Sequence, residues 1–299
     1  MFRLLTLSVF LAPGLLYAQQ GDRLPAYLLQ VPVSVAAILV AEADTSTLHR
    51  FETGIGGLEY RDERYMSVGQ NGVGKQRPWD RRTPLGIYFV NEQLDTSGLH
   101  EKYGPMAFPL DYPNAWDRIN KRSGGGIWIH GVAPNSGRRP PLDTDGCIAL
   151  SNEELRTLEK QLVPLVTPVV ITREIQWVSP EQLAATRAEL NAVLELWADS
   201  YRSGDLHRYL TLYADDFGYR GMDRETWASF RARTMAATPL RDFTLTDVLL
   251  LADPEDAGLY LSRFRETIVD QNREIATIKR LYWRRSANGD LRIVAEDNG

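Results

Sequence analysis

The sequence has very little cysteine, because Cys147 is the only one among its 299 residues. A single cysteine excludes a disulfide bond within the chain. It also argues against a zinc site, since the other candidate ligands, His49, His100 and His207, are scattered. The thiol is therefore either a small buried apolar group or a reactive nucleophile, and composition alone leaves both interpretations open.

The chain also lacks an apolar run long enough to span a membrane. The N-terminal run Leu4–Leu16 is shorter than the about 20 residues that a bilayer requires, and Pro13-Gly14 interrupts it. Arg3 precedes this run and Leu16-Tyr17-Ala18 follows it, which is the pattern of a cleaved signal peptide, with a membrane anchor as the weaker alternative. We therefore expect an exported, periplasmic protein without stable membrane insertion.

An excess of positive charge is absent as well. The formal net charge is −5, and no basic stripe stands out, so a nucleic-acid partner is not expected. Hydrophobic residues make up 43% of the chain, which is enough for packed cores. No pattern in the sequence identifies a protein partner.

The first half of the chain has the pattern of short strands separated by loops rich in glycine and proline. The predicted strands are 35–41, 48–51, 65–68, 86–90, 127–129, 147–150 and 168–171. Ser151 and Glu154 form a capping-box pattern, which predicts a helix through about Leu162. This half is therefore expected to be mainly β.

The second half reverses this order and begins with helices. Ser179-Pro180 followed by Gln182 is a helix start signal, and the apolar residues after it lie on one helical face. Shorter helices are predicted over 206–213 and 224–235, and strands over 243–251, 258–267, 274–284 and 291–295. Asn288-Gly289 predicts a hairpin between the last two strands. Helices followed by an antiparallel sheet indicate an α+β domain.

Cys147 and His130 form a candidate nucleophile and base. The thiolate is the reactive form, so an imidazole that takes the thiol proton is expected to keep the sulfur charged as an ion pair. The carbonyl of Gly131 is a suitable partner for the other ring nitrogen of His130. Gly146 permits a tight bend, and the backbone N–H groups of Gly146 and Cys147 are candidates for stabilising an oxyanion. Such a site performs acyl transfer through a thioester, with no metal and no cofactor.

These motifs resemble the signature of the L,D-transpeptidase (YkuD) catalytic domain. The resemblance lies in Ile127–Gly131 and Thr144–Asn152, and the segments 67–69, 80–88 and 110–114 resemble further parts of the same family. Together the matching segments cover about residues 35–172. The resemblance implies a mainly-β YkuD-type fold.

The same resemblance implies an activity on peptidoglycan stem tetrapeptides. Cys147 would attack the carbonyl at the L-centre of the third residue, a diamino acid, and release D-alanine. An amine then takes the acyl group in an L,D-transpeptidase, and water takes it in an L,D-carboxypeptidase. His130 would be the base and Gly131 its backbone orienter.

The sequence departs from the family pattern at three positions. Thr144 stands where the family often has Ser, Asp145 where it has His or another polar residue, and Ala149 where it has Arg. Without this Arg, the chain lacks one residue that would bind the carboxylate of the donor peptide. The candidate substrate-binding residues are Tyr112, Lys75, Arg138, Arg139 and Asp145, although the three cations are more simply solvated.

Residues 180–299 resemble a nuclear-transport-factor-2-like cone domain of α+β type. The resemblance lies in Trp197, Ser203–Asp205, Tyr213–Phe217 and Lys279–Arg285. A domain of this kind after a YkuD domain resembles the cell-shape-determining proteins of helical bacteria. The sequence does not identify a ligand of the second domain.

The predicted organisation is a signal peptide (1–18), a lead segment (19–34), the catalytic domain (35–173), a linker (174–179) and the second domain (180–299). The start signal at Ser179 favours a second domain that folds independently. Two functions remain open. One is a cysteine enzyme that modifies peptidoglycan, and the other is a peptidoglycan-binding protein that keeps the fold without turnover.

Overall fold

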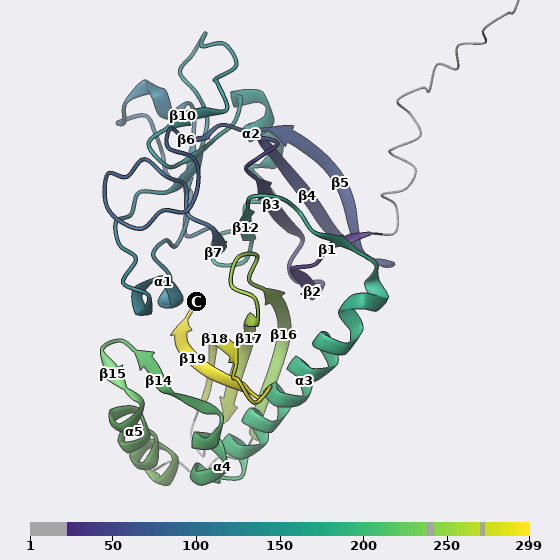
Figure 1. The fold of residues 1–299 in the computed structure, drawn as a ribbon, viewed down its shortest axis with the longest axis vertical. Coiled ribbons are helices and arrows are strands. Elements are labelled where there is room, and N and C mark those ends of the chain that lie inside the picture. The colour runs from purple at the N-terminus through teal and green to yellow at the C-terminus, as the bar shows by residue number, and fades with distance from the viewer. Residues whose placement is uncertain (1–22, 238–241, 270–272) are drawn as a thin grey trace, which may run out of the picture.

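Two lobes make up this computed structural model, which describes residues 23–237, 242–269 and 273–299 (Figure 1). The upper lobe in the figure contains the first half of the chain, and the lower lobe contains the helices and long strands of the second half. The predicted signal peptide and residues 19–22 of the lead segment lie outside the described residues. Within the described ranges, no helix is long and apolar enough to cross a membrane.

A five-stranded sheet forms the centre of the upper lobe, in the order β5-β4-β3-β12-β7. Its strands are β3 (Ala37–Glu42), β4 (Thr47–Gly54), β5 (Gly57–Tyr65), β7 (Gly86–Phe89) and β12 (Pro168–Thr172). β3 and β12 run parallel, whereas the other neighbours are antiparallel. Four predicted strands are confirmed here. The predicted strand 65–68 is wrong, because β5 ends at Tyr65 and a separate short strand begins at Val68.

Short strands and helices beside this sheet carry the sequence motifs. A three-stranded sheet has the order β11-β9-β8, and β10 pairs with β6. These elements are β6 (Val68–Gly69), β8 (Ala107–Pro109), β9 (Trp128–His130), β10 (Leu142–Thr144), β11 (Ile148–Ala149), α1 (Ala115–Ile119) and α2 (Asn152–Leu158). The capping box at Ser151 is present, although α2 ends four residues before the predicted Leu162.

The lower lobe is a seven-stranded sheet with three helices, in the order β15-β14-β19-β18-β17-β16-β2. Its elements are β2 (Leu28–Gln30), α3 (Pro180–Arg202), α4 (Leu206–Thr211), β14 (Tyr213–Tyr219), β15 (Met222–Asp223), α5 (Arg224–Ala237), β16 (Asp242–Ala252), β17 (Leu259–Val269), β18 (Glu274–Arg285) and β19 (Leu291–Asn298). A two-stranded sheet pairs β1 (Leu24–Pro25) with β13 (Trp177–Val178).

The three predicted helices and the hairpin at Asn288-Gly289 are confirmed. The four predicted strands pair antiparallel, as expected. β14, which the sequence did not indicate, extends the sheet by pairing parallel to β19. Residues 212 and 213 also do not belong to the predicted helix, since Tyr213 begins β14. The sequence also did not indicate β2 of the lead segment, which pairs with β16.

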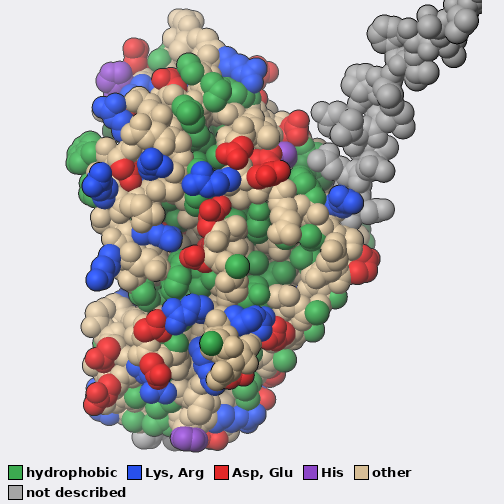
Figure 2. Space-filling view, viewed as in Figure 1, with side chains coloured by type: hydrophobic (Ala, Val, Ile, Leu, Met, Phe, Trp, Pro, Cys, Tyr) green, Lys and Arg blue, Asp and Glu red, His purple; other side chains and the backbone are tan. Residues whose placement is uncertain are grey.

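Both faces of β3 and β12, in the middle of the five-stranded sheet, are buried. Ile38 and Val40 of β3 point into a core shared with Leu249 and Leu261 of the lower lobe, whereas Leu39 points into the core of the upper lobe. Hydrophobic side chains also reach the surface where the two lobes meet (Figure 2). One apolar core therefore joins the lobes, which argues against the expectation that the second domain folds independently.

Ion pairs reinforce this junction. Arg280 of β18 pairs with Asp111 of the upper lobe at 2.5 Å and with Asp297 of β19 at 2.5 Å. Trp116 of α1 donates a hydrogen bond to Asp256 at 2.8 Å. The C-terminal end of β19 lies beside α1 (Figure 1).

Candidate active site

Cys147 lies at the end of a tight bend that Gly146 makes before β11. The φ angle of Gly146 is 122°, and an added Cβ would lie 2.7 Å from the carbonyl oxygen of Arg82, so a glycine is required there. The Thr144 hydroxyl bridges the bend: it donates to the Cys147 carbonyl at 2.8 Å and accepts from the Gly146 N–H at 3.1 Å. The sulfur is therefore held at a defined position.

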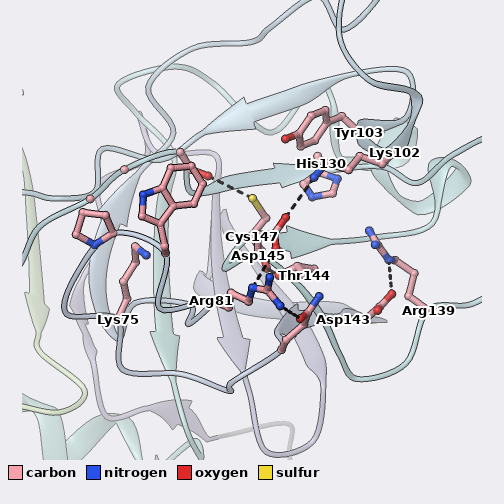
Figure 3. Close-up of a pocket in the computed structure, with 16 residues that line it drawn as sticks. Lys75, Arg81, Lys102, Tyr103, His130, Arg139, Asp143, Thr144, Asp145 and Cys147 are labelled. Atoms are coloured by element: carbon pink, nitrogen blue, oxygen red, sulfur yellow. Dashed lines mark hydrogen bonds and ion pairs between the residues drawn. The ribbon is translucent and has the colours of Figure 1, made fainter.

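His130 ends β9, the strand that runs parallel to β11, with Ala149 paired to His130. This register brings the His130 ring and the Cys147 sulfur into one cavity from neighbouring strands (Figure 3). The ring is 2% exposed, and Nδ1 lies 2.6 Å from the Gly131 carbonyl oxygen. Tyr103 packs edge-on against it with a centroid distance of 5.2 Å. These contacts place a proton on Nδ1 and leave Nε2 as the acceptor.

Asn152 fixes the backbone that follows His130 in the chain. Its side-chain oxygen accepts from the Val132 N–H and its side-chain nitrogen donates to the Val132 carbonyl, both at 2.9 Å. A Cβ on Gly131 would lie 2.2 Å from this Asn152 oxygen. Gly131 is thus both the orienting carbonyl and a residue that admits no side chain.

The buried site holds both groups in their neutral forms. Burial raises the pKa of the Cys147 thiol to about 11, against a backbone hydrogen bond at Trp128 that lowers it. Burial lowers the pKa of His130 to about 4, although the hydrogen bond to Gly131 opposes this shift. Both shifts favour neutral groups in the resting site over the expected thiolate–imidazolium pair. The thiol instead donates to the carbonyl oxygen of Gly126 at 3.3 Å.

The two predicted oxyanion donors differ in availability. The Gly146 N–H is already bound to the Thr144 hydroxyl. In the described part of the chain, no atom accepts a hydrogen bond from the Cys147 N–H. The Cys147 N–H is thus the better placed of the two to receive an oxyanion.

The cavity around Cys147 has a volume of about 780 Å³ and carries more positive than negative charge. The cationic lining residues are Lys75, Arg81, Lys102 and Arg139, and the acidic ones are Asp143 and Asp145. Lys and Arg side chains also recur along the left edge of the upper lobe, where the loops around β6 and β10 lie (Figure 2). Such a lining favours an anionic ligand.

Three of the predicted substrate-binding residues line this cavity, each with a partner. Lys75 is only 4% exposed and pairs with Asp80 at 2.8 Å, so the expectation that it is solvated is wrong. Arg139 pairs with Asp143 at 2.8 Å. Asp145 lies 3.2 Å from the Lys102 ammonium, and both point across the cavity (Figure 3).

The other two predicted substrate-binding residues, Arg138 and Tyr112, lie outside the cavity. Arg138 stacks on the ring of Tyr65 at 3.6 Å and borders a second cavity of about 290 Å³ together with Ala149. The Tyr112 ring is buried in the core of the upper lobe, and its hydroxyl donates to the Ser123 carbonyl at 3.1 Å. Neither side chain is directed at the sulfur.

Several residues of the site had no clear signal in the sequence. They are Trp79, Lys102 and Tyr103, which come from segments far from Cys147 in the chain. Asn152 lies at the end of the matched segment Thr144–Asn152, but the sequence did not indicate its contact with Val132. Within the described ranges, no three His, Cys, Asp or Glu side chains gather as a metal site requires.

Each of the two lobes matches a known protein family. The L,D-transpeptidase (YkuD) catalytic domain family matches residues 38–171, the segment that contains Cys147 and His130. The chain has a YkuD-type L,D-transpeptidase domain. Residues 189–297 match the Cds6 C-terminal NTF2-like domain, so an NTF2-like domain follows the YkuD domain. No curated protein sequence matches the chain at a significant level.

Solved structures share this two-domain fold. Bd1075 of Bdellovibrio bacteriovorus is 23% identical, with a TM-score of 0.76 over 93% of this chain and 98% of that one. The helical cell shape determining protein Pgp2 of Campylobacter jejuni is 24% identical, with a TM-score of 0.74 over 95% of this chain and 98% of that one. At these identities the likeness shows the fold alone. The mainly-β YkuD-type domain followed by an α+β NTF2-like domain is therefore confirmed.

Proposed function

We propose that this YkuD-type protein is a cysteine acyl-transfer enzyme that cuts peptidoglycan stem tetrapeptides after their third residue. The observation that carries the proposal is the shared cavity of Cys147 and His130, in which the ring is oriented by the Gly131 carbonyl. A nucleophile, a base and an orienter in this order are the parts that acyl transfer requires.

The neutral resting pair defines the first step. As the Cys147 sulfur attacks the carbonyl carbon of the third residue, its proton passes to Nε2 of His130. The carbonyl oxygen becomes an oxyanion, which the Cys147 N–H stabilises. When the carbon–nitrogen bond breaks, the imidazolium returns the proton to the leaving amine of D-alanine, and a thioester remains.

The second step consumes the thioester. Neutral His130 takes a proton from the acceptor, either water or the amine of another stem peptide, and the acceptor attacks the thioester carbonyl. Water yields a tripeptide, as in an L,D-carboxypeptidase, and an amine yields a cross-link, as in an L,D-transpeptidase. The sulfur leaves and recovers the proton as the thiol.

The cavity charge supports a carboxylate-bearing substrate. Arg81, Lys102 and Arg139 line the cavity without the full burial that Lys75 has. In the absence of the family's Arg at Ala149, Lys102 and Arg81 are the residues that we assign to the donor carboxylate, with Asp145 releasing them on binding.

The proposed setting is the cell wall. The N-terminal signal pattern supports export to the periplasm, and the fold shared with Pgp2 supports a role in cell shape. Both assignments are part of the proposal.

Mass spectrometry of muropeptides tests the proposal. The purified chain is incubated with disaccharide tetrapeptides, and we expect release of D-alanine together with a tripeptide or a cross-linked product. Cys147→Ser should form neither product, because a serine hydroxyl in this site is a far weaker nucleophile. A folded wild-type protein that binds muropeptides but forms no product would favour the peptidoglycan-binding alternative.

A further inference from the structure

Trp79 is exposed beside the catalytic cavity, unlike the tryptophans of the second domain. Its side chain is 94% exposed, whereas Trp197, Trp227 and Trp283 are almost completely buried. Trp79 nevertheless lines the same cavity as Cys147. An exposed indole at the edge of a reaction site offers a large, flat apolar face to a ligand.

The backbone at Trp79 adopts a conformation that tryptophan rarely takes. Its φ angle is 64°, and it is the third residue of the turn Arg77–Asp80, a position at which glycine or asparagine is usual when φ is positive. Residues held in this region are concentrated at functional sites, where the surrounding structure imposes them. Burial does not explain a tryptophan here, so a ligand contact is the natural reason.

The turn is held rigidly by the Asp80 carboxylate. This carboxylate accepts hydrogen bonds from Lys75 Nζ and the Gln76 N–H at 2.8 Å, from the Arg77 N–H at 3.1 Å and from the Arg82 N–H at 3.2 Å. The Asp80 carbonyl also accepts from Asn71 at 2.9 Å. The indole is thus presented on a preorganised loop, which lowers the entropic cost of binding a ligand.

The segment 123–126 connects this turn to the sulfur. The Ser123 N–H donates to the Gln76 carbonyl at 3.0 Å, and a Cβ on Gly124 would lie 3.3 Å from Cα of Pro78. At the other end, the Gly126 carbonyl accepts the Cys147 thiol. Cys147 is 6% exposed, so the cavity runs from the exposed indole to the buried nucleophile.

We infer that Trp79 is a stacking platform for a saccharide ring of the substrate, an inference that rests on the proposed function. A pyranose presents a flat C–H face and needs only one aromatic surface, whereas an apolar peptide side chain gains most from an enclosed pocket, which a 94% exposed indole does not provide. Gln70, which also lines the cavity, supplies polar groups for sugar hydroxyls.

The stem peptide of such a substrate has to reach from the indole to the sulfur. In a stem peptide joined to its saccharide, three residues separate the sugar from the bond that Cys147 attacks, and an extended chain of that length spans about 10 Å. The cationic lining then faces the peptide carboxylates, and the indole faces the sugar. Trp79 is accordingly a specificity-determining residue that selects glycan-linked stems over free peptides.

Calorimetric binding to the Cys147→Ala protein tests this inference without turnover. The ligands are a disaccharide tetrapeptide and the same tetrapeptide without sugar. Trp79→Ala should weaken binding of the disaccharide form by roughly tenfold and change binding of the free peptide by less than about twofold. Trp79→Phe should retain part of the difference, because it keeps an aromatic face.

Ile55→Ala is the matched control, because Ile55 is also fully exposed but does not line the cavity. An equal loss for both ligands, no loss for either, or a disaccharide that adds no affinity in the parent protein would overturn the inference. Failure of the proposed function has a different signature, namely that the wild type releases no D-alanine from either ligand while the two binding constants still differ.

Discussion

Nδ1 of His130 lies 2.6 Å from the carbonyl oxygen of Gly131, and this contact determines which ring nitrogen faces the reaction. A carbonyl only accepts hydrogen bonds, so Nδ1 carries the proton and Nε2 has a free lone pair. Because burial also lowers the pKa of this imidazole to about 4, the lone pair is available at neutral pH. The site is poised as a neutral base beside a neutral thiol.

The first prediction concerns the ionisation of Cys147. Since burial raises the pKa of the thiol to about 11, the rate of iodoacetamide labelling should keep rising between pH 7 and about pH 10. The labelling rate of the unfolded protein in urea provides the reference for an ordinary thiol. A plateau of the folded protein below pH 8.5 would restore the ion-pair mechanism.

The second prediction concerns His130. His130→Gln should reduce the turnover of tetrapeptides by about 10²–10⁴-fold, the usual contribution of a general base. In the wild type, kcat/KM should fall as the pH drops through about 4, because protonation of the imidazole removes the acceptor. Steady-state rates from pH 3.5 to 8 measure this limb. An acid limb near pH 6.5 would indicate an imidazole that is solvated rather than buried.

The third prediction concerns the hydroxyl of Thr144. Thr144→Val removes the bridge between Gly146 and the Cys147 carbonyl and leaves buried polar groups unpaired, at a cost of about 1–3 kcal/mol. We expect tetrapeptide turnover to fall by roughly 10- to 100-fold. Thr144→Ser is the matched control, because it keeps the hydroxyl and should lie within about threefold of the wild type. Equal rates for both variants would show that the bridge does not position the sulfur.

The fourth prediction concerns the ion pair between the domains. Arg280→Met leaves the buried carboxylates of Asp111 and Asp297 without their cation, so the free energy of unfolding in urea should fall by about 3–5 kcal/mol. Arg284→Met is the control, since Arg284 pairs with Asp216 at the surface, where a pair is worth about 1 kcal/mol or less. Similar losses for both variants would contradict a special role of Arg280 at the junction.

The fifth prediction concerns a fragment that ends at residue 174. Ile38, Val40 and Val170 would lose the apolar side chains of the lower lobe, and β2 would lose its partner strand β16. The fragment 23–174 should therefore bind a hydrophobic dye and unfold without a sharp thermal transition. The full chain should bind no dye and should unfold in one sharp transition. A cooperative fragment with wild-type labelling of Cys147 would show that the catalytic domain folds alone.

Local features of the chain are well predicted from the sequence. The bend at Gly146, the helix caps at Ser151 and Ser179 and the hairpin at Asn288-Gly289 all depend on residues close together in sequence. Two strands of the second sheet were not predicted, and they share a physical reason. Strand β2 and the parallel pairing of β14 with β19 join segments far apart in the chain, and no local pattern reports such contacts.

By itself, the sequence determined the two-domain class, the order of most helices and strands, and the pair of residues to which we assign acyl-transfer chemistry. Only the tertiary structure decided that burial favours neutral forms of Cys147 and His130, that Lys75 is buried against Asp80, and that one apolar core joins the domains. Backbone conformation follows from neighbouring residues. Burial, and with it every shift in pKa, follows from segments that meet only when the whole chain has folded.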